Sequence, residues 1–261
     1  MVAEKLQILI GNDDGIESPG IQALANALSE IATVYVAAPN QEKSGASHGI
    51  SVGVPLEVES YPFPAKVAAA WRITGTPADC MKIALEELCK GIAIDLVVAG
   101  INRGPNLGTD VFYSGTIAAA FEGFILGYPA LAASIDSFAQ DYDYNLAANL
   151  CKKVVLWWQK QNFLPKVLFN LNTPAILTEE TPIHLTTLGK RLYQNVFTKT
   201  ERSGKTYYTM GGNPKDDLQD QNSDVYWIKQ QCATITPLSD RMLSVDHYDV
   251  LQKLALAGKI F

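Results

Sequence analysis

Two adjacent carboxylates follow a short apolar run close to the N-terminus. Residues 8–11 lead directly into Asn12, Asp13, Asp14 and Gly15. The apolar, β-branched run predicts a buried strand. Two acids at the end of such a strand repel each other, and a divalent cation is the simplest way to relieve that repulsion. The alternative is a polar turn in which Asp and Gly serve only their backbone preferences.

A loop of small polar residues follows the second predicted strand. That strand covers residues 33–38 and is stopped by Pro39, and the loop covers residues 40–53. Because open α/β folds bind ligands at the carboxyl ends of their strands, we expect this loop beside the two acids. Its candidate ligands are Asn40, Ser44 and Gly45, with His48 as a candidate proton donor or substrate contact. A mobile connection without function is the alternative.

A third strand end and a helix start add further polar groups. Residues 92–99 predict a buried strand that runs into a glycine-rich loop, and residues 117–126 predict an apolar helix. The polar and glycine residues of these two segments are Asn102, Asn106, Ser114, Gly115 and Thr116. A helix start offers free N–H groups and a favourable dipole, which makes it a good anion site. The alternative is an ordinary Ser/Thr cap.

The segments between these motifs alternate strand and helix signals. Ser18 and Pro19 mark a helix start, and strand, helix and strand within this length form a βαβ unit with parallel strands. Thr76, Pro77 and Asp79 mark a second helix start with a capping box. Other elements are expected at residues 54–73 (short β segments), 130–134 (strand), 142–160 (helix) and 166–170 (strand). The expected fold is α/β, a Rossmann-like, mostly parallel sheet flanked by helices.

Beyond Pro174 the pattern changes to short β-like runs separated by polar turns. These runs cover residues 183–187, 190–199, 205–210, 225–228 and 232–236, and a helix over about 246–257 closes the chain. We predict one domain, residues 1–261, with a core over about 1–178, a protruding antiparallel β arm over about 179–240 and a C-terminal helix over about 241–261. Such arms often pair between subunits. An extension within a monomer is the alternative.

Composition narrows the class of protein. The 261 residues are 48% hydrophobic, which is enough for a large core, and the net charge is −6. No run of Lys or Arg stands out, so we expect no nucleic-acid duplex as partner. The apolar window 117–133 is broken by Glu122 and Pro129, so no membrane span is expected. Four cysteines without CxxC spacing, and no room for a signal peptide before the first strand, favour a cytoplasmic protein.

The candidate residues converge on one edge of the predicted sheet. The carboxylates of Asp13 and Asp14, the hydroxyl of Ser44 and the amide of Asn102 make a set of hard oxygen ligands. Such a set suits Mg²⁺ or Mn²⁺ rather than zinc. A hard cation beside an anion-binding helix start suggests phosphate ester chemistry.

The sequence also resembles the SurE survival proteins, which are divalent-metal-dependent 5′(3′)-nucleotidases. The motifs that carry the resemblance cover the first half of the chain in the family's order. They are Asn12-Asp13-Asp14-Gly15, Ser18-Pro19-Gly20-Ile21, Ala38-Pro39 with Ser44-Gly45, Gly75-Thr76-Pro77-Ala78-Asp79-Cys80, Gly100-Ile101-Asn102 with Gly104, Asn106 and Gly108, and Tyr113-Ser114-Gly115-Thr116.

The resemblance implies that Asp13, Asp14, Ser44 and Asn102 hold one divalent metal per subunit, and that the C-terminal arm is used in homodimers or homotetramers. The expected reaction is hydrolysis of nucleoside 5′- and 3′-monophosphates to nucleoside and phosphate. Asp13, Asp14 and Asn102 are the expected catalytic residues. The expected substrate and phosphate contacts are Asn12, Asn40, Gly45, Asn106, Ser114, Gly115 and Thr116.

Two other kinds of protein place acids after a first strand. A receiver-type phosphate- or nucleotide-binding module needs a phosphoacceptor Asp at the end of a middle strand, where this chain has Asn102. A haloacid-dehalogenase-type phosphatase needs Asp-x-Asp, whereas Asp13 and Asp14 are adjacent. Trapping of a phosphorylated enzyme would favour the second alternative.

Overall fold

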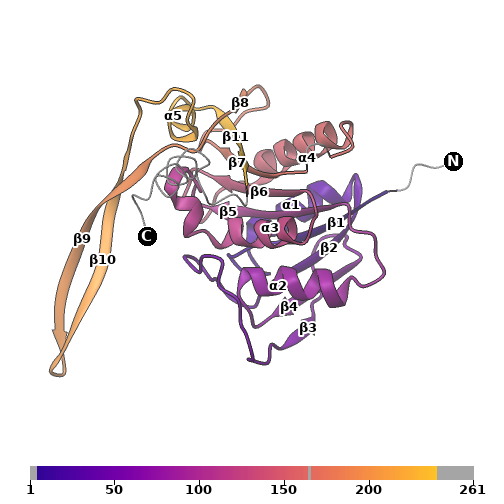
Figure 1. The fold of residues 1–261 in the computed structure, drawn as a ribbon, viewed down its shortest axis with the longest axis horizontal. Coiled ribbons are helices and arrows are strands. Elements are labelled where there is room, and N and C mark those ends of the chain that lie inside the picture. Colours follow the sequence, from indigo (N-terminus) through magenta and orange to yellow (C-terminus); the bar gives the residue numbers. More distant parts are fainter. Residues whose placement is uncertain (1–4, 164–165, 240–261) are drawn as a thin grey trace, which may run out of the picture.

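The structure is a computed structural model that describes residues 5–163 and 166–239. A nine-stranded sheet with the order β3-β4-β2-β1-β5-β6-β7-β11-β8 forms its centre. Helices cover both faces of the sheet, and the hairpin β9–β10 projects far from it (Figure 1). The strands of the sheet are β1 (Leu6–Gly11), β2 (Ala32–Pro39), β3 (Val58–Ser60), β4 (Ala69–Ile73), β5 (Leu96–Arg103), β6 (Ala130–Ile135), β7 (Leu168–Thr173), β8 (Ile183–Leu185) and β11 (Ala233–Leu238).

The centre of the sheet is parallel, as predicted. β1 lies between β2 and β5 and is parallel to both, and the parallel pairing continues through β6 to β7. In the part of this sheet that the structure describes, antiparallel pairing occurs only towards the edges, between β3 and β4 and between β7 and β11. The carboxyl ends of β1, β2 and β5 therefore meet, which brings the three predicted polar segments to one edge.

Two helix layers bury the two faces of the sheet. Helices α1 (Pro19–Ser29) and α4 (Asn145–Gln159) share one apolar cluster with Ile8 and Ile10. Leu9 points to the opposite face and joins the cluster under α2 (Pro77–Ile83) and α3 (Gly115–Ile125). This alternation follows from the two-residue period of a strand and explains why three consecutive residues of β1, Ile8, Leu9 and Ile10, are all apolar.

The predicted helix starts are confirmed. Pro19 lies in the first turn of α1. The hydroxyl of Thr76 accepts the N–H of Asp79, and the Asp79 carboxylate accepts the N–H of Thr76, so the capping box is complete. A π-helical segment, η1 (Ala84–Leu88), continues α2.

The C-terminal third differs from the prediction. Among the described residues, only β9 (Arg191–Arg202) and β10 (Lys205–Asp216) form the projecting hairpin, which is shorter than the predicted arm over about 179–240. β8 and β11 belong to the main sheet. The predicted strand at 225–228 is wrong, because Ser223 caps a short helix, α5 (Asp224–Lys229). The predicted helix at 246–257 lies outside the described residues.

Two further observations concern the cysteines and membrane-spanning helices. The four cysteines are free and buried, so they pack in the protein interior. Among residues 5–163 and 166–239, no helix has the length and apolar character needed to cross a membrane.

Gly20 allows α1 to approach β5 next to Asn102. A Cβ at Gly20 would lie 2.0 Å from the carbonyl oxygen of Ile101. Helix propensity alone predicts that Gly20→Ala stabilises the protein by about 1 kcal/mol. We expect the opposite, a loss of at least about 2 kcal/mol, because the backbone must move. Urea unfolding would measure this.

The matched control is Gly49→Ala. A Cβ at Gly49 would meet only the Ala46 carbonyl oxygen, at 3.5 Å. We expect this substitution to change stability by no more than about 0.5 kcal/mol. Equal unfolding midpoints for the two variants would contradict the packing argument.

Candidate active site

Asp13 is buried where the first turn of α3 meets the end of β1. Its side chain is 4% exposed, and its Oδ1 accepts a hydrogen bond from the hydroxyl of Thr116. Its Oδ2 faces Gly115, where an added Cβ would lie 2.9 Å from Oδ2 and 2.7 Å from the Asp13 Cβ. Glycine is therefore required at the start of α3, since any side chain there would displace the carboxylate.

Asp14 is the start of a chain of contacts that reaches Ser44. Its Oδ2 accepts the N–H of Arg103, at 3.1 Å. The Arg103 guanidinium lies 3.5 Å from Glu42, and the Ser44 hydroxyl donates to Glu42 at 2.7 Å. The Lys43 N–H also donates to the Asp13 carbonyl, at 2.8 Å. The predicted ligands from β1 and from the loop after β2 thus lie at the same sheet edge.

Two asparagines fix the turns around the acids. Asn102 donates its Nδ2 to the Gly104 carbonyl at 2.7 Å, which leaves its amide oxygen to accept other groups. Asn12 donates to the Gly15 carbonyl at 2.9 Å and to the Ser18 hydroxyl at 2.8 Å. The Asn12 Oδ1 is buried and has no hydrogen-bond partner within the described part of the chain.

Burial makes both carboxylates costly to ionise. Burial raises the pKa of Asp13 to about 7, the charge of Asp14 acts in the same direction, and the Thr116 hydroxyl opposes the shift. Burial also raises the pKa of Asp14, opposed by the N–H and the charge of Arg103. A divalent cation would reverse this penalty.

The donor set fits such a cation. Residues 5–163 and 166–239 hold no group of three or more His, Cys, Asp or Glu arranged for a metal ion. A cation here would be held by two carboxylates and completed by neutral oxygens. The Thr116 hydroxyl holds the Asp13 carboxylate and the Arg103 N–H holds that of Asp14, so both acids are fixed at the same sheet edge.

The loop over residues 40–53 is docked, not free. Ser47 donates to the carbonyls of Phe112 at 2.7 Å and Tyr113 at 3.1 Å. Ser51 donates its N–H and its hydroxyl to Asp79, both at 2.8 Å. His48 Nε2 lies 2.8 Å from the Glu122 carboxylate on α3. This contact makes His48 an anchor of the loop in this structure.

Three predicted substrate contacts are in supporting positions. Thr116 is fully buried, and its hydroxyl is committed to Asp13. Ser114 caps α3 by accepting the Ile117 N–H at 3.0 Å. Asn106 is buried and donates its Nδ2 to the Ser134 hydroxyl, at 2.8 Å.

The remaining predicted contacts lie further out. Asn40 donates its N–H to the Ile73 carbonyl at 2.9 Å and lines a cavity with Glu57 and Arg72 at the β3–β4 side. Gly45 is exposed with positive φ, and an added Cβ would meet nothing within 4 Å.

The residues that hold Asp14, Ser44 and Asn106 in place were not predicted from the sequence. Arg103 and Glu42 connect Asp14 to Ser44, and the amides of Asn170 and Asn172 donate to the Asn106 carbonyl at 2.8 and 3.1 Å. A signal existed for the asparagines, because they alternate with apolar residues along β7 although that strand is fully buried.

Comparison with known proteins decides the family. A family profile described as "Survival protein SurE" matches residues 8–195. The chain belongs to the SurE family. A relative named "5'-nucleotidase SurE" from Syntrophomonas wolfei is 44% identical over 235 residues, which are 89% of this chain and 88% of the relative. One of the same name from Pelotomaculum thermopropionicum is 42% identical over 98% of this chain and 97% of its own.

The fold agrees with a solved SurE structure. The crystal structure titled "Sure Protein from Aquifex aeolicus" superposes with a TM-score of 0.81 at 30% identity, over 97% of this chain and 99% of that one. This SurE chain therefore shares both sequence and architecture with the family across nearly its whole length.

The buried Asp13 predicts a pH-dependent stability of the metal-free SurE chain. With its pKa raised from 3.8 to about 7, the folded state keeps a proton that the unfolded state releases. Stability therefore falls as pH rises from about 4 to 7. In EDTA, we expect the free energy of unfolding of Asp13→Asn to exceed that of the wild type by on the order of 1 kcal/mol at pH 5 and 4 kcal/mol at pH 8.

Urea unfolding at both pH values would measure this difference. Comparing the two proteins cancels the titration of groups that do not interact with Asp13, and Mn²⁺ at pH 8 should stabilise the wild type more than the variant. Parallel pH profiles of the two proteins in EDTA would contradict the argument.

Proposed function

We propose that this protein is a divalent-metal-dependent 5′-nucleotidase that hydrolyses nucleoside 5′- and 3′-monophosphates to nucleoside and phosphate. The observation that carries the proposal is the adjacent pair of buried Asp13, held by Thr116 in the first turn of α3, and half-buried Asp14, held by Arg103 at the end of β5. The printed name of the relatives, "5'-nucleotidase SurE", supports the same activity.

One Mg²⁺ or Mn²⁺ per subunit would be held by Asp13, Asp14, Asn102 and Ser44. Asp13, Asp14 and Asn102 lie at adjacent strand ends, and Ser44 reaches that edge through Glu42 and Arg103. When bound, a divalent cation supplies charge neutralisation at the phosphoryl oxygens and lowers the pKa of the attacking water.

The protein's own groups bind and orient the substrate. The first turn of α3 provides a partial positive charge, and the Gly115 backbone can be approached closely because it has no side chain. We assign Ser114 and Gly115 to the phosphate side of the site, and Thr116 acts there by fixing Asp13. The substrate contacts Asn12, Asn40, Gly45 and Asn106 stay part of the proposal, with Asn106 acting through its loop.

A mechanism with a phosphorylated aspartate is the second candidate reaction. It would need an aspartate oxygen free to attack phosphorus in line. Such phosphatases use an Asp-x-Asp pair, whereas Asp13 and Asp14 are adjacent, and this favours a ligand role over a nucleophilic one.

Acid-to-amide substitutions test the metal mechanism. We expect Asp13→Asn and Asp14→Asn each to lower kcat/KM for AMP by at least about a hundredfold, because each removes a charged ligand. EDTA should abolish phosphate release, and Mg²⁺ or Mn²⁺ should restore it.

The control is Asp95→Asn, the same chemical change at the opposite edge of the sheet. Asp95 directly precedes β5 and accepts the Gln7 N–H at 2.8 Å. Its activity should equal that of the wild type. Full activity in EDTA would overturn the metal mechanism, and a trapped phosphoenzyme would favour the second candidate.

We also propose that the protein is cytoplasmic and forms a homodimer or homotetramer through the β9–β10 hairpin. Phe197 and Met210 pair directly across the hairpin, and both are more than half exposed. Tyr208 on the same face is also exposed. Exposed apolar side chains on an isolated hairpin are typical of a surface covered by another chain.

Charge placed on this face should weaken assembly. We expect Met210→Glu to reduce the molar mass measured by sedimentation, since a carboxylate would be buried in the interface. Thr209→Glu, on the opposite face of the same strand, is the control and should leave the mass unchanged. A monomeric wild type, or equal masses for all three proteins, would contradict the assembly proposal.

A further inference from the structure

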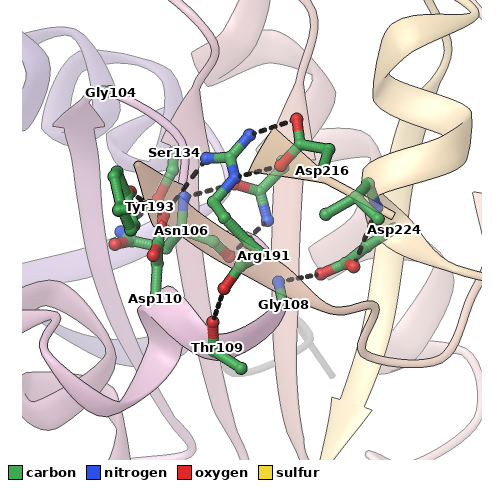
Figure 2. A network of polar contacts seen from close by, with 12 residues as sticks. Gly104, Asn106, Gly108, Thr109, Asp110, Ser134, Arg191, Tyr193, Asp216 and Asp224 are labelled. Atoms are coloured by element: carbon green, nitrogen blue, oxygen red, sulfur yellow. Dashed lines mark hydrogen bonds and ion pairs between the residues drawn. The ribbon is translucent and has the colours of Figure 1, made fainter. Parts of the chain in front are cut away.

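The loop over residues 104–113 joins β5 to α3 and leads directly to Ser114. Its first half is held by the main sheet. Asn106 receives its contacts there from Ser134 on β6 and from Asn170 and Asn172 on β7. Figure 2 shows Asn106 and Ser134 at one side of the polar network that surrounds this loop.

The second half of the loop is held by the base of the hairpin. Arg191, the first residue of β9, is 5% exposed. Its guanidinium contacts Asp216 on β10 at 2.6 and 3.1 Å and Asp110 on η2 (Gly108–Phe112) at 3.1 Å (Figure 2). The Thr109 hydroxyl donates to the Arg191 carbonyl, and the Tyr193 hydroxyl donates to Asp110 at 2.7 Å.

A buried carboxylate closes the same junction. Asp224 accepts the N–H groups of Gly108 at 2.9 Å and of Gly189 at 2.8 Å. A Cβ at Gly108 would lie 2.8 Å from the Gly189 carbonyl oxygen, and φ at Gly108 is +52°. The loop and the entry to β9 are therefore in backbone contact, with no space to slide past each other.

Arg191 is the shared member of this junction. Asp216 has a second cation, Lys229 at 3.6 Å, whereas Asp110 has Arg191 and the Tyr193 hydroxyl. Loss of the guanidinium would leave the half-buried Asp110 carboxylate, whose side chain is 13% exposed, with no cation among its described contacts, so we expect η2 to move away from the hairpin. Lysine keeps the charge but cannot reproduce the planar fork that reaches two carboxylates.

Displacement of η2 would reach the substrate side of the site. The carbonyls of Phe112 and Tyr113 hold Ser47 of the loop after β2, and Ser114 begins α3. Asp13, Asp14 and Asn102, by contrast, are fixed to strand ends of the main sheet. The effect of a shift should therefore fall on phosphate affinity more than on metal affinity.

We propose that Arg191 is a positioning residue. It links the position of the β9–β10 hairpin on the main sheet to the position of the first turn of α3, where the phosphate binds. This inference rests on the proposed nucleotidase function. Arg191 touches neither substrate nor metal in this scheme, and acts through Asp110 and the loop before Ser114.

Steady-state kinetics of the full chain with saturating Mn²⁺ tests the coupling. We expect Arg191→Lys and Asp110→Asn each to raise KM for AMP, and Ki for inorganic phosphate, by at least about tenfold, with kcat and the Mn²⁺ activation constant changed by less than about threefold. Asp110→Asn keeps the shape of the side chain and serves where Arg191→Lys folds poorly. Arg202→Lys, the same substitution at the far end of β9, is the control and should match the wild type.

A purely structural role gives a different result. It would reduce the amount of active enzyme, so that kcat falls while KM and Ki stay constant, and this would overturn the proposal. A wild type that hydrolyses no nucleoside 5′- or 3′-monophosphate would refute the nucleotidase function. In that case calorimetry would measure the affinity of wild type and variants for inorganic phosphate in the presence of Mn²⁺. Equal affinities, or no binding by the wild type, would overturn the proposed coupling.

Discussion

The burial of the Asp13 carboxylate against the first turn of α3 is the constraint on which the site depends. Desolvation raises the pKa of this acid to about 7, and Asp14 adds a second half-buried carboxylate. The desolvation of these carboxylates lowers the stability of the folded state, and the fold places two anionic groups at one point. It does so with Gly115, which lets α3 approach, and Thr116, which fixes one carboxylate oxygen. Destabilised sites of this kind are typical where function and stability compete.

The supports of the site come from distant parts of the chain. The loop after β2 is held by Asp79 on α2 and Glu122 on α3, and the loop before α3 is held by β6, β7 and the hairpin base. No single element places the ligands. The main sheet fixes the acids, and the surrounding loops fix the groups that face the substrate, so the two halves of the site have separate structural origins.

How far the sequence predicts this structure depends on the range of the interactions. Helix starts at Pro19 and Thr76 follow from local hydrogen bonds, so they were predictable, and the parallel core followed from its βαβ order. The membership of β8 and β11 in the main sheet was not predictable, because their partner strands are distant in the sequence. α5 was missed because its start depends on one cap, Ser223. Contacts such as Arg103 with Glu42 have no local pattern.

The strand order has a consequence for synthesis of the chain. β11 pairs with β7 on one side and with β8 on the other, so among the described strands β8 has no partner in the main sheet until β11 has left the ribosome. During that interval β7 is an open edge, and the hairpin lies within the intervening loop. A nascent chain that stalls before residue 233 would expose this edge to other chains, which makes completion of translation part of the protein's protection against aggregation.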